Sequence, residues 1–183
     1  MVYGEQQHRE SKTIRERTIS LNLSDADVLR ISEKAASVGL TVSQLLENFI
    51  GDLVCGTYSN GSDERLFANQ WLDRCGFTMY AEKSLLRYAL LHEELDGLLR
   101  AWDERADLLK DIAEAEENPA DMDREEKTAL QEELAFWDEN LQELFTAYRQ
   151  YHPQCADIDK EMEAVLQWRD KYHELLGANT YPA

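Results

Sequence analysis

The sequence has little that would indicate disulfide bridges, membrane-spanning segments or a secretion signal. Its three cysteines, Cys55, Cys75 and Cys155, are an odd number without CxxC spacing, which indicates free thiols in a reducing compartment. No apolar run approaches the roughly 20 residues of a transmembrane helix, and the polar opening MVYGEQQHRE is unlike a signal peptide. We therefore expect a soluble, cytoplasmic protein.

Motifs of catalysis and of metal binding are also missing. The chain contains no glycine-rich phosphate loop, no GxSxG elbow and no HExxH zinc motif. His152 and Cys155 alone cannot complete a zinc site, and the single Asp170-x-x-His173 pair lacks the second copy that a di-iron helical bundle requires. The sequence thus predicts a non-enzymatic protein with no cofactor and no metal.

Basic residues are scarce, and the scarcity is uneven along the chain. The 183 residues hold 19 Lys and Arg against 37 Asp and Glu, a formal charge of −18. Residues 1–55 hold 6 bases and 8 acids, a net −2, whereas residues 56–183 hold 13 and 29, a net −16. Because duplex DNA repels an anionic body, we expect any DNA contact from the nearly neutral N-terminal part, with modest and salt-sensitive affinity.

One short strand and two helices are predicted within residues 17–46. Between residues 18 and 23, apolar and polar side chains alternate as in a strand with one buried face. Ser24 is placed to cap a first helix, Gly39 to end it, and Thr41 or Ser43 to cap a second. The apolar positions with helical spacing are Val28, Ile31, Ala35 and Val38 in the first helix and Val42, Leu45, Leu46 and Phe49 in the second.

This segment resembles the ribbon-helix-helix domains of the Arc/MetJ/CopG family. Leu23 precedes Gly39 by the interval that the family uses. Leu40 and Thr41 supply the leucine and the small hydroxyl residue that the family favours after the glycine. The sequence departs from the family at Ser24, where a proline is usual.

The resemblance implies a dimeric, DNA-binding domain over residues 17–55. In such a homodimer the strands of two chains pair antiparallel above four helices. The alternative is that residues 18–23 pair within one chain, but the sequence offers no second strand candidate. The implied dimer core comprises Ile19, Leu21, Leu23, Ile31, Leu45 and Phe49.

The same resemblance implies contacts with double-stranded DNA. Outward side chains of the paired strands would enter the major groove, where Asn can read adenine and Ser and Thr discriminate weakly. These base-contacting residues are Thr18, Ser20 and Asn22. Phosphates would be held at the start of the second helix and by a flexible basic arm over residues 1–16, whose other interpretation is a solvated tail. The phosphate-contacting residues are Arg9, Lys12, Arg15, Arg17, Thr41, Val42 and Ser43.

The remaining hydrophobic spacing is helical almost throughout. We predict a linker with a short helix over residues 56–78, an acidic antiparallel helical hairpin, bundle or coiled coil over residues 79–177, and a frayed tail over residues 178–183. One long helix is expected from Thr78 to the turn at Asn118-Pro119. A second carries a heptad seam of Leu130, Leu134, Trp137, Leu141, Leu144, Tyr148 and Tyr151. The predicted class is mainly α: a dimeric ribbon-helix-helix followed by an acidic helical domain.

Carboxylates are concentrated where the two long helices are predicted to meet. Residues 103–139 hold 15 acids and 4 bases, a net −11. One interpretation is a solvated helical face. The other is a rigid surface that presents a phosphate-like field to a protein with a cationic groove. The residues assigned to this acidic partner-binding surface are Asp103, Glu104, Asp107, Asp111, Glu114, Glu116 and Glu117.

The segment TYSNGSDERLFANQWLDRCGF, residues 57–77, and the acidic helices after it resemble accessory proteins of phages and mobile elements, including type II-A anti-CRISPR proteins. This resemblance assigns no role to any residue. It implies a bacterial host cell and a non-enzymatic inhibitor that binds Cas9 or its guide complex and blocks cleavage of target DNA. The competing interpretation is a ribbon-helix-helix transcriptional regulator whose C-terminal helical domain binds a partner. The large acidic part favours the inhibitor.

Overall fold

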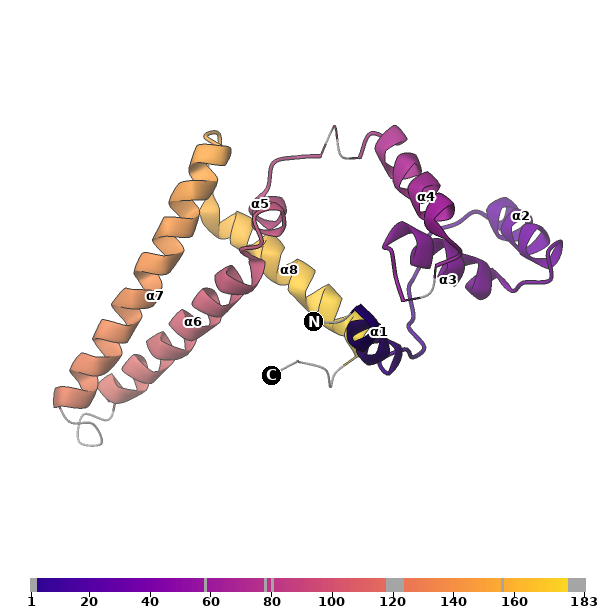
Figure 1. Ribbon diagram of the computed structural model, residues 1–183. Helices are drawn as coiled ribbons and strands as arrows, with labels where there is room; N and C mark the ends of the chain where they lie inside the picture. The colour runs from indigo at the N-terminus through magenta and orange to yellow at the C-terminus, as the bar shows by residue number, and fades with distance from the viewer. Residues whose placement is uncertain are drawn as a thin grey trace. The chain divides into compact units, whose positions relative to one another are not determined.

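All regular structure in the described part of the chain is α-helical (Figure 1). The computed structural model describes residues 3–57, 59–77, 79, 81–117, 124–155 and 157–177, so the tail predicted over residues 178–183 lies outside them. The helices are α1 (Tyr3–Ser11), α2 (Asp25–Ala36), α3 (Val42–Leu53), α4 (Ser62–Arg74), α5 (Leu85–Leu91), α6 (Leu95–Glu117), α7 (Arg124–Tyr151) and α8 (Ile158–Leu176). The predicted mainly α class is confirmed.

The predicted strand, and with it the ribbon-helix-helix fold, is wrong. Residues 18–23 are irregular, and no β-strand occurs in the residues that the structure describes. A strand needs a neighbour for its backbone N–H and C=O groups, whereas the described elements are helices that pair these groups internally. Side-chain alternation is a local pattern and does not supply that neighbour. The N-terminal unit is therefore helical, without a two-stranded ribbon.

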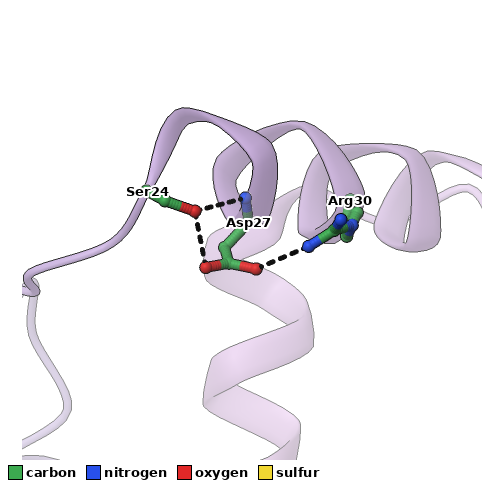
Figure 2. Close-up of polar contacts among 3 residues, drawn as sticks. All are labelled: Ser24, Asp27 and Arg30. Carbon is green, nitrogen blue, oxygen red and sulfur yellow. Dashed lines mark hydrogen bonds and ion pairs between the residues drawn. The ribbon is translucent and has the colours of Figure 1, made fainter.

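The helix signals next to this segment are confirmed. Ser24 caps α2: its hydroxyl accepts a hydrogen bond from the Asp27 amide at 3.2 Å and donates one to the Asp27 carboxylate at 2.7 Å (Figure 2). The other oxygen of that carboxylate pairs with Arg30 at 3.1 Å. Gly39 follows α2 with a φ of 75°, the left-handed conformation that glycine adopts at little cost. Thr41 then begins α3 with a complete capping box.

Helix α1 occurs in a segment predicted to be flexible, whereas α4 is the short helix predicted within residues 56–78. The predicted flexible arm over residues 1–16 includes α1, whose last turn carries His8 and Arg9, where cations complement the helix dipole. The predicted linker over residues 56–78 includes α4, which packs on α3. The chain divides into two compact units, a first unit of Met1–Ala81 with Leu175–Ala183 and a second unit of Glu82–Glu174. Helix α4 thus belongs to the first unit.

The long helix predicted before the hairpin turn is broken into α5 and α6. Glu93 has a φ of 59°, and the amide of Glu94 donates to the carbonyl of Ala89 at 2.8 Å, a hydrogen bond that ends many helices. Glycine is the usual residue at that left-handed position, so a glutamate there gives no sequence signal of a break. Thr78, the predicted start of this helix, lies outside the described residues.

The second unit is built around the pair of long helices α6 and α7. The heptad seam predicted for α7 is confirmed, because all seven of its side chains are buried or half-buried. The buried side of α6 has the same spacing, through Leu98, Ala101, Arg105, Leu108 and Ile112. Helices α5 and α8 contribute to the same core, whose most deeply buried side chains are Leu85, Ala89, Leu98, Ala101, Tyr148, Met162 and Val165.

Tyr148 makes this core sensitive to high pH. Its side chain is fully buried, and its hydroxyl has no hydrogen-bond partner among the described residues. Burial raises the pKa of the Tyr148 phenol, and the nearby Glu161 carboxylate and Cys155 thiol raise that pKa further. Because the folded-state pKa is the higher one, the neutral phenol stabilises the fold fully below the unfolded value of about 10, and this contribution is lost as pH rises above it.

The free energy of unfolding of the wild type should fall when the pH is raised from neutral to above about 10. We expect a smaller fall in Tyr148→Phe, because the variant has no phenol to ionise at this position. At neutral pH the variant should lie within about 1 kcal/mol of the wild type, because no hydrogen bond is removed. Urea titrations at both pH values measure the difference. Tyr172→Phe is the matched control at an exposed tyrosine, and an alkaline loss of stability equal in wild type and Tyr148→Phe would contradict the expectation.

Candidate partner-binding surface

Four of the predicted acidic residues form one stripe along α6. Asp103, Asp107, Asp111 and Glu114 follow one another at helical spacing, and all four are exposed. We call this set the α6 stripe. It lies away from the heptad side of the helix that packs against α7. Four residues of helix advance about 6 Å, and the Debye length at physiological salt is about 8 Å. The fields of neighbouring carboxylates in the stripe therefore add.

A second stripe, on α7, was not predicted as part of this surface. Glu125, Glu132, Glu139 and Glu143 are exposed and lie opposite the buried seam of α7. We call this set the α7 stripe. The predicted heptad seam is the sequence signal for this stripe, because the residues opposite a buried seam form the outward face of the same helix. Both outer sides of the hairpin therefore carry rows of carboxylates.

Ion pairs neutralise part of the predicted surface. Asp103 receives two hydrogen bonds of 2.8 Å from one guanidinium nitrogen of Arg169 on α8. The other pairs within the predicted set join Arg100 to Glu104 at 3.9 Å, Lys110 to Glu114 at 3.7 Å and Lys127 to Glu116 at 4.0 Å. Such exposed pairs contribute about 0–1 kcal/mol each to stability. They lower the local charge without burying it.

The least compensated carboxylates of the predicted surface are Asp107 and Asp111. Both are exposed, and neither forms an ion pair with any residue that the structure describes. On α7, Glu132 and Glu139 have the same properties. The side chain of Glu117 lies outside the described residues. The charge available to a partner is thus centred on the middle of both helices rather than on all seven predicted residues.

This arrangement suits the binding of a large cationic surface rather than of a small cation. The carboxylates are spread along the outer sides of two helices of 23 and 28 residues. No group of three His, Cys, Asp or Glu side chains within the described ranges converges as metal ligands do. A partner with a row of Lys or Arg side chains could face several carboxylates at once, which favours rapid, salt-dependent association.

The residues predicted to contact DNA are not brought together as a base-reading surface. Thr18, Ser20 and Asn22 are exposed on the irregular segment before α2, without the ladder that would align them. Arg17 donates hydrogen bonds to the carbonyls of Leu175 at 3.1 Å and Leu176 at 2.5 Å. Its guanidinium thus satisfies the last turn of α8.

The other predicted phosphate contacts are dispersed over three elements. Arg9 lies in α1, while Lys12 and Arg15 lie between α1 and α2. At the start of α3, the Thr41 hydroxyl accepts from the Gln44 amide at 3.2 Å, and the Thr41 amide donates to the Gln44 side chain at 2.9 Å. The capping box therefore uses the Thr41 amide, one of those proposed for an anion. The remaining predicted contacts, Val42 and Ser43, follow directly in α3.

The predicted dimer core is largely solvent-exposed in the single chain. Ile19, Leu21 and Leu23 are 56%, 57% and 53% exposed, and Phe49 is 41% exposed. The remaining members, Ile31 and Leu45, are half-buried. One chain therefore does not bury this set by itself.

Comparison with protein-family models, with curated proteins and with solved structures finds no match to the chain. Within the described residues, every helix is too short or too polar to cross a lipid bilayer.

Proposed function

We propose that the protein is a non-enzymatic inhibitor whose acidic helical hairpin docks into the cationic groove of a nucleic-acid enzyme, and that Cas9 with its guide RNA is this enzyme. The observation that carries the proposal is the exposure of Asp107 and Asp111 in the α6 stripe without a described cationic partner. The second unit holds 11 bases and 26 acids, a net −15, so the field around the stripe is negative over many residues.

Cas9 supplies a fitting surface. It holds the guide–target heteroduplex in a positively charged channel and contacts it through shape and backbone rather than sequence. A helix that repeats carboxylates about every 6 Å presents negative charge at intervals on the scale of a nucleic-acid backbone. Occupation of that channel by the hairpin would exclude target DNA. The resemblance of residues 57–77 and the acidic helices to type II-A anti-CRISPR proteins supports the same partner.

A transcriptional regulator is not proposed. Its reading of an operator would depend on a paired ribbon carrying Thr18, Ser20 and Asn22, and the described residues contain no strand. The net charge of −18 also opposes contact with DNA phosphates.

The test is cleavage of a target plasmid by purified Cas9–guide RNA complex with increasing amounts of this protein. Added before the DNA, the protein should reduce cleavage in proportion to its occupancy of the complex. Added after the DNA, it should inhibit much less, because the channel is already filled. Polyglutamate at equal total charge is the control for a non-specific acid effect. Full cleavage in the presence of excess protein would overturn the proposal.

A further inference from the structure

The described residues of the first unit bury few apolar side chains. Among its described residues, the apolar side chains that are buried are those of Ala35 and Ala68. Of the 21 large apolar residues that are exposed in the described chain, 16 belong to this unit. The second unit, by contrast, buries Tyr148, Met162 and Val165 completely. Where exposed apolar side chains lie side by side, they mark an interaction site.

The exposed apolar residues include an ordered row of aromatic rings. Phe49 on α3 and Trp71 on α4 meet edge to face with ring centroids 5.6 Å apart, and Trp71 meets Phe77 in the same way at 6.2 Å. Phe67 lies one helical turn before Trp71 on α4. Phe49, Phe67, Trp71 and Phe77, here called the aromatic surface, are 41%, 63%, 41% and 59% exposed.

We propose that the aromatic surface packs against the aromatic surface of a second copy of this chain, so that two first units share one core. Four aromatic side chains at these exposures leave on the order of 400 Å² for contact. The next residue after Phe49, Ile50, is 44% exposed and adds to this area, against the roughly 800 Å² per partner of a stable interface. The contact needs no strand.

The charge distribution places the contact between two copies in the first unit. That unit holds 8 bases and 11 acids, a net −3, whereas the second unit carries −15. Two copies that meet through their first units therefore bring together nearly neutral surfaces. Two copies that meet through their second units would bring together strongly negative ones, at a cost that rises as salt is lowered.

A second copy also fits the need for permanent cover. A unit that buries few apolar side chains gains little free energy to offset the conformational entropy lost on folding. Its partner must therefore be present whenever the unit is folded. A second copy of the chain is always available during folding, and a self-complementary patch closes into a symmetric dimer. Aromatic residues at the centre and few charges are typical of such interfaces.

Light scattering of the full chain tests this proposal. The wild type should have twice the 21.2 kDa mass of one chain. Phe67→Lys should raise the dimer dissociation constant by at least about tenfold, because a charge would be buried at the contact. Phe136→Lys is the matched control: Phe136 is an aromatic residue of α7 with 56% exposure, close to the 63% of Phe67, and the variant should remain dimeric.

Phe77 lies outside the helices, so Phe77→Lys repeats the test without changing a helical residue. If both variants lose the dimer, a disruption of α4 by Phe67→Lys cannot be the sole cause. Both variants should become monomeric at concentrations where the wild type is a dimer. A wild-type mass of one chain would overturn the proposal, as would a dimer that survives both substitutions. The thermal midpoint of the wild type should also rise over about a hundredfold increase in concentration, whereas a constant midpoint would contradict a shared core.

Discussion

Replacing Asp107 and Asp111 together with lysine is expected to abolish inhibition of Cas9 by this protein. The double substitution changes the charge of the α6 stripe by four units at its two least compensated positions. A cationic groove that attracted the stripe would then meet two added cations, and like-charge contacts cost several kcal/mol. We expect affinity for the Cas9–guide RNA complex to fall by at least about a hundredfold, equivalent to about 2.8 kcal/mol.

A matched control separates the stripe from the total charge. Glu163→Lys with Glu174→Lys also changes four charge units at exposed acids of the second unit, but on α8 rather than on the hairpin. This variant should bind almost as tightly as the wild type. Binding measured by surface immobilisation of the complex, together with circular dichroism of each variant, completes the comparison. Equal losses in both double variants would assign the effect to net charge alone and contradict a role for the stripe.

The second large effect is expected in the core of the second unit, from Leu98→Ala. Leu98 is 1% exposed and lies on the buried side of α6 that faces α7. Truncation leaves a cavity among close-packed side chains, and the substitution is expected to lower the free energy of unfolding by about 3 kcal/mol. Urea denaturation followed by tryptophan fluorescence measures the loss, because three of the four tryptophans, Trp102, Trp137 and Trp168, belong to this unit.

Leu109→Ala provides the control on the same helix. Leu109 is 40% exposed, so its truncation removes less buried surface and should cost about 1 kcal/mol or less. Equal losses from Leu98→Ala and Leu109→Ala would show that α6 does not bury the side that carries Leu98 in preference to the side that carries Leu109. An unfolding transition unchanged by Leu98→Ala would contradict the shared core of α5, α6, α7 and α8.

The helices were predictable from sequence where a local pattern coincided with a packing requirement. The heptad seam of α7 was found because seven apolar positions recur over four turns or more, which local propensity alone does not produce. The cap at Ser24, the choice of Thr41 or Ser43 for the next cap, and a stop near Gly39, which lies three residues after the end of α2, were predictable because each of these residues acts on its own neighbours in sequence. These features need no information from the rest of the chain.

The errors arose where structure depends on distant partners or on unusual local geometry. The alternation in residues 18–23 predicted a strand, but a strand forms only beside another strand, and the sequence pattern cannot provide one. The break between α5 and α6 at Glu93 is not predictable from the sequence. Glycine usually occupies such a left-handed position, and here a glutamate does. The short helix predicted within residues 56–78 is present as α4, but its packing against α3 is a tertiary contact that the local sequence does not show.

The candidate surface was only partly predictable for a similar reason. The acidic run was visible as composition, yet composition does not tell which carboxylates are paired. Asp103 and Arg169 are far apart in sequence but meet in the fold, which removes part of the charge assigned to Asp103. Prediction of the α7 stripe requires one further inference, that the residues opposite the heptad seam face outward. The structure thus narrows the acidic surface to positions such as Asp107, Asp111, Glu132 and Glu139.

The salt dependence of binding to the Cas9–guide RNA complex tests the central claim most directly. An interaction carried by exposed carboxylates facing a cationic groove should be tight at about 0.1 M salt and weaken by more than about tenfold at about 0.5 M, where screening is much stronger. Titration of the wild-type protein at both salt concentrations measures this change. Absence of binding at the lower concentration, or an affinity that is the same at both, would contradict the proposed electrostatic docking of the acidic hairpin.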